Sequence, residues 1–313
     1  MRIVFLAALC LASAPVPLLA QTANPSVFEL EPGTLVDGAA ARIYTMVPDG
    51  GIVALNLTDG SRQWQSDDAA KPVGLLNGHL AVYREAGTKI VFLDPETGRE
   101  GPWTAASLSL PETAWTRVDD GLGRSLTLSM KTTDRGADLL WQSESRTVRA
   151  RPPGPGDATD DDIAFGGLAI DAQNGQATAV SRTAPLSPSL RFTMLNEADR
   201  LPNLQGRQFL SIDGGAVLIS NRIGDDRIRN KYRWTLYDRA TGDPLGRFDA
   251  DRSVDAFFVA GKTLVYVARP YFWRDGDQFR EDPLRLRAID LDSGRLLWER
   301  ALRDTEYRGP FPP

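Results

Sequence analysis

Apolar and polar residues alternate with a period of two along much of this chain, which is the pattern of β-strands. In residues 286–291, successive side chains point to opposite faces, a tight turn follows, and residues 295–298 run back antiparallel. Comparable pairs of short runs precede this hairpin, and no long stretch has a helical period. The sequence therefore predicts an all-β fold of short antiparallel strands.

One short phrase recurs along the chain. It has an apolar or small residue, Asp or Asn two positions later, Gly four positions after that, and usually an aromatic residue one turn later. The carboxylate can accept backbone N–H bonds in the turn, and Gly supplies the positive φ that a tight hairpin requires. The repeat residues that we interpret as structural are Asp94, Asp171, Asp238 and Asp290; Gly60, Gly98, Gly175, Gly242 and Gly294; and Trp64, Trp103 and Trp298.

A further pair of strand-like runs precedes each copy of the phrase, so the repeating unit has four strands. Turn glycines recur about every forty residues, the repeat length typical of β-propeller blades, which lie radially around a channel. We predict a β-propeller of four-stranded antiparallel blades, about six of them within a range of five to seven. This number treats Gly136 with Trp141 as a degenerate blade. One hairpin cannot bury a Trp alone, so the tryptophans are expected to pack between blades.

The phrase Ala-x-Asp-x-x-Ser-Gly-x-x-x-Trp at residues 288–298 resembles the tryptophan-docking repeat of the pyrroloquinoline-quinone-like (PQQ-like) propellers. Residues 54–64 are close to it, residues 92–103 shift the Trp by one position, and the copies at Ala169 and Leu236 lack it. The resemblance implies that residues 21–313 form a single PQQ-like β-propeller domain.

The resemblance also bears on cofactors. The quinone dehydrogenases that share this repeat are much longer and hold a calcium ion and a vicinal disulfide, whereas this chain has one Cys. The comparison therefore implies the non-catalytic branch of the family, without PQQ or another cofactor.

Residues 1–20 have the pattern of a secretory signal peptide: Arg2, then a short apolar run, then polar residues from Gln21. That run is too short to remain as a membrane span. The residue before Cys10 is Leu9, which is not the small residue that a lipidation motif needs. We expect a soluble periplasmic or secreted bacterial protein whose mature chain has no cysteine and no transmembrane segment.

Charge and composition exclude several function classes. The chain has 36 Lys and Arg against 41 Asp and Glu, so no basic field favours nucleic acid as a partner. His79 is the single histidine, which excludes His/Cys zinc sites and Cys-His catalysis in the mature chain. Four aspartates in residues 149–162 fit no calcium-binding spacing and are interpreted as a solvated acidic loop. No spacing singles out a catalytic pair of carboxylates or a metal site.

Two polar stretches, residues 221–231 and 269–282, interrupt the repeat between the second and third strands of their blades. Such connections emerge on one face, opposite the turn glycines, so we expect two long loops on a shared surface. Aromatic residues and Arg give a large contact area at little rotamer cost. The predicted partner-binding residues are Tyr271, Phe272, Trp273 and Arg274, with Arg227 and Arg229 on the neighbouring loop. The competing interpretation is that these aromatics fold back onto their own blade.

The sequence thus predicts a non-catalytic cell-envelope binding or scaffold protein that uses one propeller face to bind a protein or peptide. The alternative is an enzyme or redox module with a ligand or quinone pocket in the central channel. The alternative requires carboxylates that converge in a channel pocket, whereas the binding protein requires exposed aromatics on the loop-bearing face.

Overall fold

The computed structural model describes residues 27–84, 89–101, 108–109, 124–145, 163–173, 175–182, 193–225, 230–269, 272–275, 278–281 and 284–303. Within these ranges the regular elements are β-strands, apart from one 3₁₀ helix at Glu197–Asp199. The prediction of an all-β fold is confirmed.

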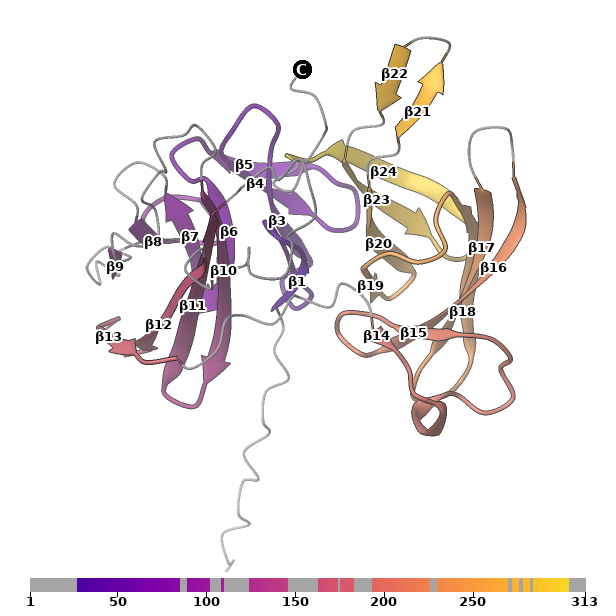
Figure 1. Ribbon diagram of the computed structural model, residues 1–313, viewed down its shortest axis with the longest axis horizontal. Coiled ribbons are helices and arrows are strands. Elements are labelled where there is room, and N and C mark those ends of the chain that lie inside the picture. Colours follow the sequence, from indigo (N-terminus) through magenta and orange to yellow (C-terminus); the bar gives the residue numbers. More distant parts are fainter. Residues whose placement is uncertain are drawn as a thin grey trace, which may run out of the picture.

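Five antiparallel sheets of four or five strands follow one another along the described chain (Figure 1), and we number them in that order. Sheet 1 contains β1 (Val27–Glu31), β2 (Thr34–Asp37), β3 (Arg42–Met46), β4 (Ile52–Asn56) and β5 (Arg62–Ser66). Sheet 2 contains β6 (Lys71–Leu76), β7 (His79–Arg84), β8 (Lys89–Leu93) and β9 (Leu108–Ser109). Sheet 3 contains β10 (Arg124–Thr133), β11 (Gly136–Ser145), β12 (Ile163–Asp171) and β13 (Ala177–Val180).

Sheet 4 contains β14 (Thr193–Met194), β15 (Gln208–Leu210), β16 (Ala216–Asp225), β17 (Asn230–Asp238) and β18 (Pro244–Ala250). Sheet 5 contains β19 (Phe257–Ala260), β20 (Thr263–Ala268), β23 (Arg285–Asp290) and β24 (Arg295–Ala301). A separate two-stranded hairpin, β21 (Phe272–Asp275) and β22 (Gln278–Glu281), leaves sheet 5 between β20 and β23. The five described sheets lie within the predicted range of five to seven blades.

One expected blade is part of another. Gly136 and Trp141 both lie in β11, and β11 pairs with β12 from Gly136 opposite Asp171 to Glu144 opposite Ile163. The interpretation of Gly136 with Trp141 as a blade of its own is therefore wrong. The long strands of sheet 3 place this segment and the turn at Gly175 in one sheet.

The inner strands of sheet 1 are buried on both faces. In β4, Ile52 and Ala54 pack in a cluster with sheet 2, whereas Val53 and Leu55 pack in a cluster with sheet 5. Because neighbouring sheets cover both faces, the strand is nearly continuously apolar rather than alternating. Equivalent clusters join sheet 2 to sheet 3 and sheet 4 to sheet 5.

The five predicted turns share one hydrogen-bond pattern. In each, the glycine N–H donates to the carbonyl oxygen of the Asp or Asn four residues earlier, at 2.7–2.9 Å. Each of these glycines has a φ between 65° and 76°. In sheet 2, Oδ1 of Asp94 also accepts the N–H groups of Glu96 and Thr97, at 2.8 and 2.9 Å. These bonds, chiefly the one from Thr97, hold the pKa of Asp94 below its usual value.

Trp64 connects sheet 1 to the turn of sheet 2. Its Nε1 donates to the carbonyl oxygen of Pro95 at 2.8 Å. Its ring lies so close to Gly98 that a Cβ added there would be 2.4 Å from the indole. Glycine at this turn therefore permits both the positive φ and the approach of the ring.

Trp298 makes the same connection between the last sheet and the first. Its Nε1 donates to the carbonyl oxygen of Leu57 at 3.1 Å, and a Cβ on Gly60 would lie 2.6 Å from its ring. Sheet 5 thus docks on sheet 1 as sheet 1 docks on sheet 2. This contact joins the last and the first of the five described sheets.

Sheet 4 uses glycine where these two sheets use Trp. A Cβ on Gly246 would lie only 2.2 Å from the carbonyl oxygen of Leu291, in the turn of sheet 5. In β5, β18 and β24 the register shifts near this position, at a β-bulge. The bulge is therefore shared, but at this position sheet 4 approaches the turn of sheet 5 with its backbone instead of an indole.

Candidate functional site

Two hairpins project from neighbouring sheets at the same end of the molecule (Figure 1). The pair β16–β17 continues beyond the body of sheet 4, with Asn221 opposite Arg233 and Asp225 opposite Asn230. The pair β21–β22 stands between β20 and β23, with Phe272 opposite Glu281. Residues 221–225 and 272–281 were expected in loops, but their described parts are antiparallel strands. Asn221, Arg222, Asn230 and Lys231 of the β16–β17 hairpin are exposed, so this ribbon needs no apolar face.

The described part of the chain covers the predicted partner-binding residues incompletely. Phe272, Trp273 and Arg274 lie in β21, and their side chains lie outside the described parts. Tyr271, Arg227 and Arg229 also lie outside the described residues. The structure thus places the backbone of three of the six residues on a projecting hairpin.

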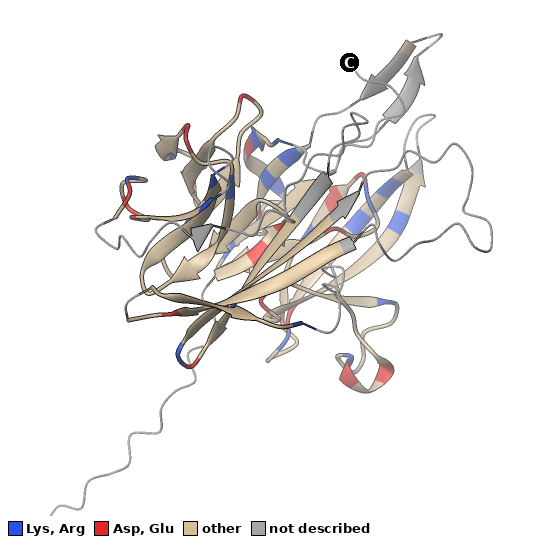
Figure 2. Ribbon diagram, turned by 60° about the vertical axis from the view of Figure 1, so that its left-hand side comes forward, with Lys and Arg blue, Asp and Glu red and all other residues tan. Residues whose placement is uncertain are grey.

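The β16–β17 hairpin carries basic residues along its strands (blue, Figure 2). Arg222 and Lys231 are exposed, and Arg233 forms an ion pair with Asp249 of β18, with Nε and Oδ1 2.8 Å apart. The hydrogen bond from Arg233 holds the pKa of Asp249 below its usual value. Because both partners are about half exposed, the pair adds little stability, and the hairpin surface is basic and solvated.

Arg269 anchors the base of the β21–β22 hairpin. It directly follows β20, and its Nη2 lies 2.7 Å from Oε1 of Glu31 at the end of β1. Its Nε lies 3.6 Å from Oδ1 of Asp255, which precedes β19. The side chains of Glu31 and Asp255 are 8% and 7% exposed. Arg269 could not be identified from the sequence, because its two partners are distant along the chain.

The anchor lies in a crowded, charged part of sheet 1. Burial raises the pKa of Glu29 on β1; Lys71 opposes this shift and Glu31 adds to it. Removal of a cation from such a region leaves carboxylates to repel one another.

We expect Arg269→Ala to destabilise the protein by about 3 kcal/mol, because two buried carboxylates would lose their shared cation. Urea unfolding followed by circular dichroism measures this change. Lys262→Ala is the matched control: Lys262 and Asp292 are paired at 2.7 Å but 65% and 64% exposed. That control should cost less than about 1 kcal/mol. Equal effects of the two substitutions would contradict the anchoring role.

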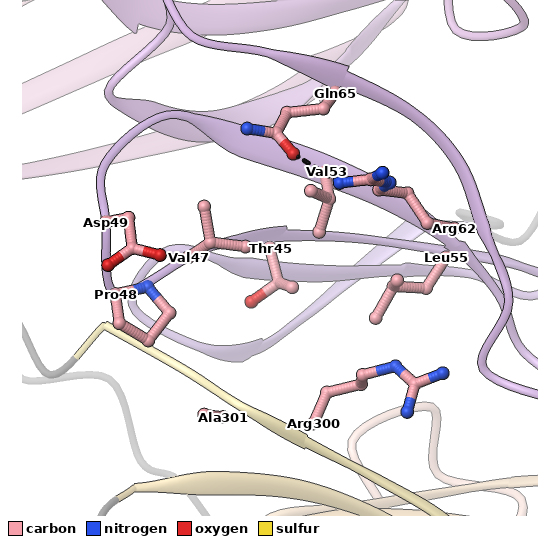
Figure 3. A pocket seen from close by; sticks show the side chains of 10 residues that line it. All are labelled: Thr45, Val47, Pro48, Asp49, Val53, Leu55, Arg62, Gln65, Arg300 and Ala301. Atoms are coloured by element: carbon pink, nitrogen blue, oxygen red, sulfur yellow. Dashed lines mark hydrogen bonds between the residues drawn. The ribbon is translucent and has the colours of Figure 1, made fainter.

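A pocket of about 390 Å³ lies between sheets 1 and 5, and we call it the seam pocket (Figure 3). Its walls come from the end of β3 and the turn that follows, from β4 and β5, and from the end of β24. The residues that line it are Thr45, Val47, Pro48, Asp49, Val53, Leu55, Arg62, Gln65, Arg300 and Ala301. A second hollow of about 590 Å³, lined by residues including Asp67, Arg84 and Arg303, lies beside the same turn.

Sequence reasoning missed the seam pocket. Arg62 and Arg300 come from opposite ends of the chain, and neither belongs to a local motif. The two arginines also occupy different positions within the repeated phrase, so the repeat does not pair them. Only the docking of sheet 5 on sheet 1 brings them together.

The described residues contain no group of three or more His, Cys, Asp and Glu that could hold a metal ion. His79 lies half-buried at the start of β7. In the same ranges, no helix is long and apolar enough to cross a bilayer. Residues 1–20, the acidic stretch at 149–162 and Trp103 lie outside the described parts of the chain.

Antiparallel sheets with repeated Asp-Gly turns, docked on one another in part through tryptophans, are typical of a β-propeller. Residues 26–127, about a third of the chain, match the sequence model of the family described as outer membrane protein assembly factor BamB. This match covers sheets 1 and 2, with the start of β10, and includes the copies at residues 54–64 and 92–103. The resemblance to PQQ-like propellers, inferred from the phrase, is therefore confirmed.

Several solved structures are similar at low identity. BamB from Moraxella catarrhalis is 14% identical, with 88% of this chain and 64% of that chain covered and a TM-score of 0.28. The quinohemoprotein alcohol dehydrogenase from Comamonas testosteroni is 11% identical, with 90% and 44% covered and a TM-score of 0.26. The Dos1 propeller is 11% identical, with 87% and 57% covered and a TM-score of 0.28.

The chain thus spans less than two thirds of the length of each of these three structures. At such identities and TM-scores, these likenesses say nothing about activity. A comparison with curated proteins gave no match.

Proposed function

We propose that this chain is a non-catalytic binding or scaffold protein of the bacterial cell envelope, periplasmic or secreted after removal of residues 1–20. It binds a protein or peptide partner on the end of the propeller that carries the β16–β17 and β21–β22 hairpins. No PQQ or other cofactor takes part in this role.

The observation that carries the proposal is the pair of hairpins projecting together from adjacent sheets (Figure 1). The blade needs only a tight turn between β20 and β23, since Ala268 and Arg285 already pair at the end of these strands. The β21–β22 ribbon is therefore an addition to the blade, and Arg269 holds its base in place. Additions of this kind on a rigid scaffold commonly carry binding. The description of the matching family, an outer membrane protein assembly factor, supports a place in the envelope.

Removal of the added hairpin tests the proposal. Replacing residues 270–283 with Asn-Gly should join β20 to β23 through a two-residue turn and leave the blade intact. We expect the yield of partner cross-linked in intact cells and identified by mass spectrometry to fall at least about tenfold, because the central contact area is lost. Circular dichroism of the purified variant checks that the sheets remain.

The control variant is Thr58→Ala, an exposed change in the turn of sheet 1 at the opposite end of the blade. It should leave the partner yield unchanged. Recovery of the same partner at the same yield from the variant without the hairpin would refute the proposed binding face. Trp273→Ala tests a single side chain of the hairpin. If this variant captures the same partners as the wild type, Trp273 does not contribute to binding.

A further inference from the structure

The seam pocket has an apolar floor. Thr45, Val53 and Leu55 are 1%, 4% and 2% exposed, and the last two belong to the cluster that joins sheets 1 and 5. Val47 and Ala301 extend this lining toward the rim. A volume of about 390 Å³ is within the range of small ligand sites, roughly 300–1,000 Å³. The floor can therefore hold an apolar side chain of a ligand.

Two arginines lie at one side of this floor, with Leu55 between them (Figure 3). Arg62 donates from Nη1 to Oε1 of Gln65 at 2.8 Å. Arg300 donates from Nε to the carbonyl oxygen of Gly60 at 3.1 Å and from Nη1 to that of Glu299 at 3.0 Å. These acceptors are uncharged. Asp59, in the turn of sheet 1, interacts electrostatically with Arg300, but within the described residues neither guanidinium forms an ion pair with a carboxylate.

Six arginines in the described ranges, by contrast, form ion pairs with carboxylates. These are Arg42, Arg84, Arg233, Arg269, Arg285 and Arg287. Glu299, the acidic residue next to Arg300 in sequence, is already shared by Arg285 and Arg287. The positive charge at the seam pocket is therefore not neutralised by an ion pair from the described part of the chain.

Charged residues are distributed asymmetrically around the pocket. Asp49 lies at the side away from Arg62 and Arg300 (Figure 3). A ligand carboxylate is attracted to the arginines and repelled from the opposite side, which fixes the orientation in which it enters. Arginine guanidinium groups, with their planar set of N–H donors, match a carboxylate well.

The pocket adjoins the proposed binding face. Ala301, at its rim, pairs with Arg285 of β23, and Arg285 pairs with Ala268 at the base of the β21–β22 hairpin. A partner held by that hairpin can therefore extend into the seam pocket.

We propose that the seam pocket binds an acidic peptide segment of the partner. An Asp or Glu carboxylate lies between Arg62 and Arg300, and a neighbouring apolar side chain lies on Val53 and Leu55. This inference rests on the proposed function and names the chemistry of the partner segment.

Titration calorimetry with two synthetic peptides tests it. The probes are acetyl-Gly-Ala-Leu-Asp-Leu-Ala-Gly-amide and the same peptide with Asn in place of Asp. The acidic peptide should bind at least about tenfold more tightly to the full chain, because only it offers a carboxylate to the arginines. This preference should shrink as salt is raised, since the two arginines are exposed.

Arg62→Glu should abolish the preference while the protein stays folded, because within the described ranges the side chain of Arg62 hydrogen-bonds to Gln65 of its own strand and not to another sheet. Arg300→Gln is the second variant and should weaken binding of the acidic peptide alone; its melting temperature is recorded because Arg300 also contacts Gly60. The control is Arg247→Glu, an exposed change on the outer strand β18 of sheet 4. It should bind both peptides as the wild type does.

Equal binding of the two peptides, binding of neither, or an unchanged preference in Arg62→Glu would overturn the inference. Partner capture separates this failure from that of the proposed function. If Arg62→Glu still captures the partner but the variant without the hairpin does not, the proposed binding face is supported and the role of the seam pocket is refuted. If the variant without the hairpin still captures the partner, the proposed binding face is refuted.

Discussion

Trp298→Ala should destabilise the protein by about 4 kcal/mol, the cost of truncating a buried Trp to Ala. Trp298 is 6% exposed, its indole donates a hydrogen bond to Leu57 and it lies against Gly60. Its removal therefore leaves a cavity at the junction of the last and first sheets. A change of 1 kcal/mol shifts the melting temperature by roughly 2–4 °C in chains of 150–250 residues and by less in longer ones, so the melting temperature should fall by about 6–8 °C. Differential scanning calorimetry measures the shift.

A neighbouring residue supplies the control for this prediction. Leu297→Ala changes a side chain on the same strand that is 48% exposed, so its effect should stay within about 0.5 kcal/mol. If both variants melt at the same temperature, the docked indole does not hold the two sheets together. An additional early transition in Trp298→Ala would indicate that this junction opens before the sheets unfold.

Gly246→Ala should cost about 3 kcal/mol, at the upper end of what overpacking usually costs. The added Cβ would lie 2.2 Å from the carbonyl oxygen of Leu291 and 2.8 Å from its Cβ. A backbone oxygen cannot rotate away, so sheets 4 and 5 would have to separate locally. Urea unfolding at constant pH measures the loss.

Gly224→Ala, in β16 of the same sheet, is the matched control, because a Cβ there meets nothing within 4 Å and its φ is not positive. It should change stability by less than about 0.5 kcal/mol. Restoration of the repeat consensus by Gly246→Trp should be more harmful than Ala, not stabilising. A stable Gly246→Trp protein would show that the junction can widen to admit an indole.

The repeat turns could be predicted from sequence because their physics is local. An Asp that accepts the following N–H groups and a Gly with positive φ lie within five residues, as at Asp290 and Gly294. The junction tryptophans could be predicted because a side chain of that size needs a second sheet to cover it. Both features depend on residue type and spacing.

Other features depend on distances between sheets, which one sequence does not encode locally. In the sequence, the copy of the phrase with Gly246 has the pattern of a degenerate repeat. In the structure, this glycine permits the backbone of sheet 4 to approach Leu291 of sheet 5. The hairpin beyond Asn221 was predicted as a loop because a solvated ribbon has no buried face and therefore no alternation of apolar and polar residues. The seam pocket depends on Arg62 and Arg300, which become neighbours only after sheets 1 and 5 have met.

The contact of Trp298 with Leu57 also has a consequence for biogenesis. The two residues are 241 positions apart, so this pairing must wait until β24 has been synthesised. Until then, the side of sheet 1 formed by Val36, Ile43, Val53 and Leu55 has no cover and is prone to aggregate. Sheet 1 therefore stays open to non-native contacts until β24 is available to cover it.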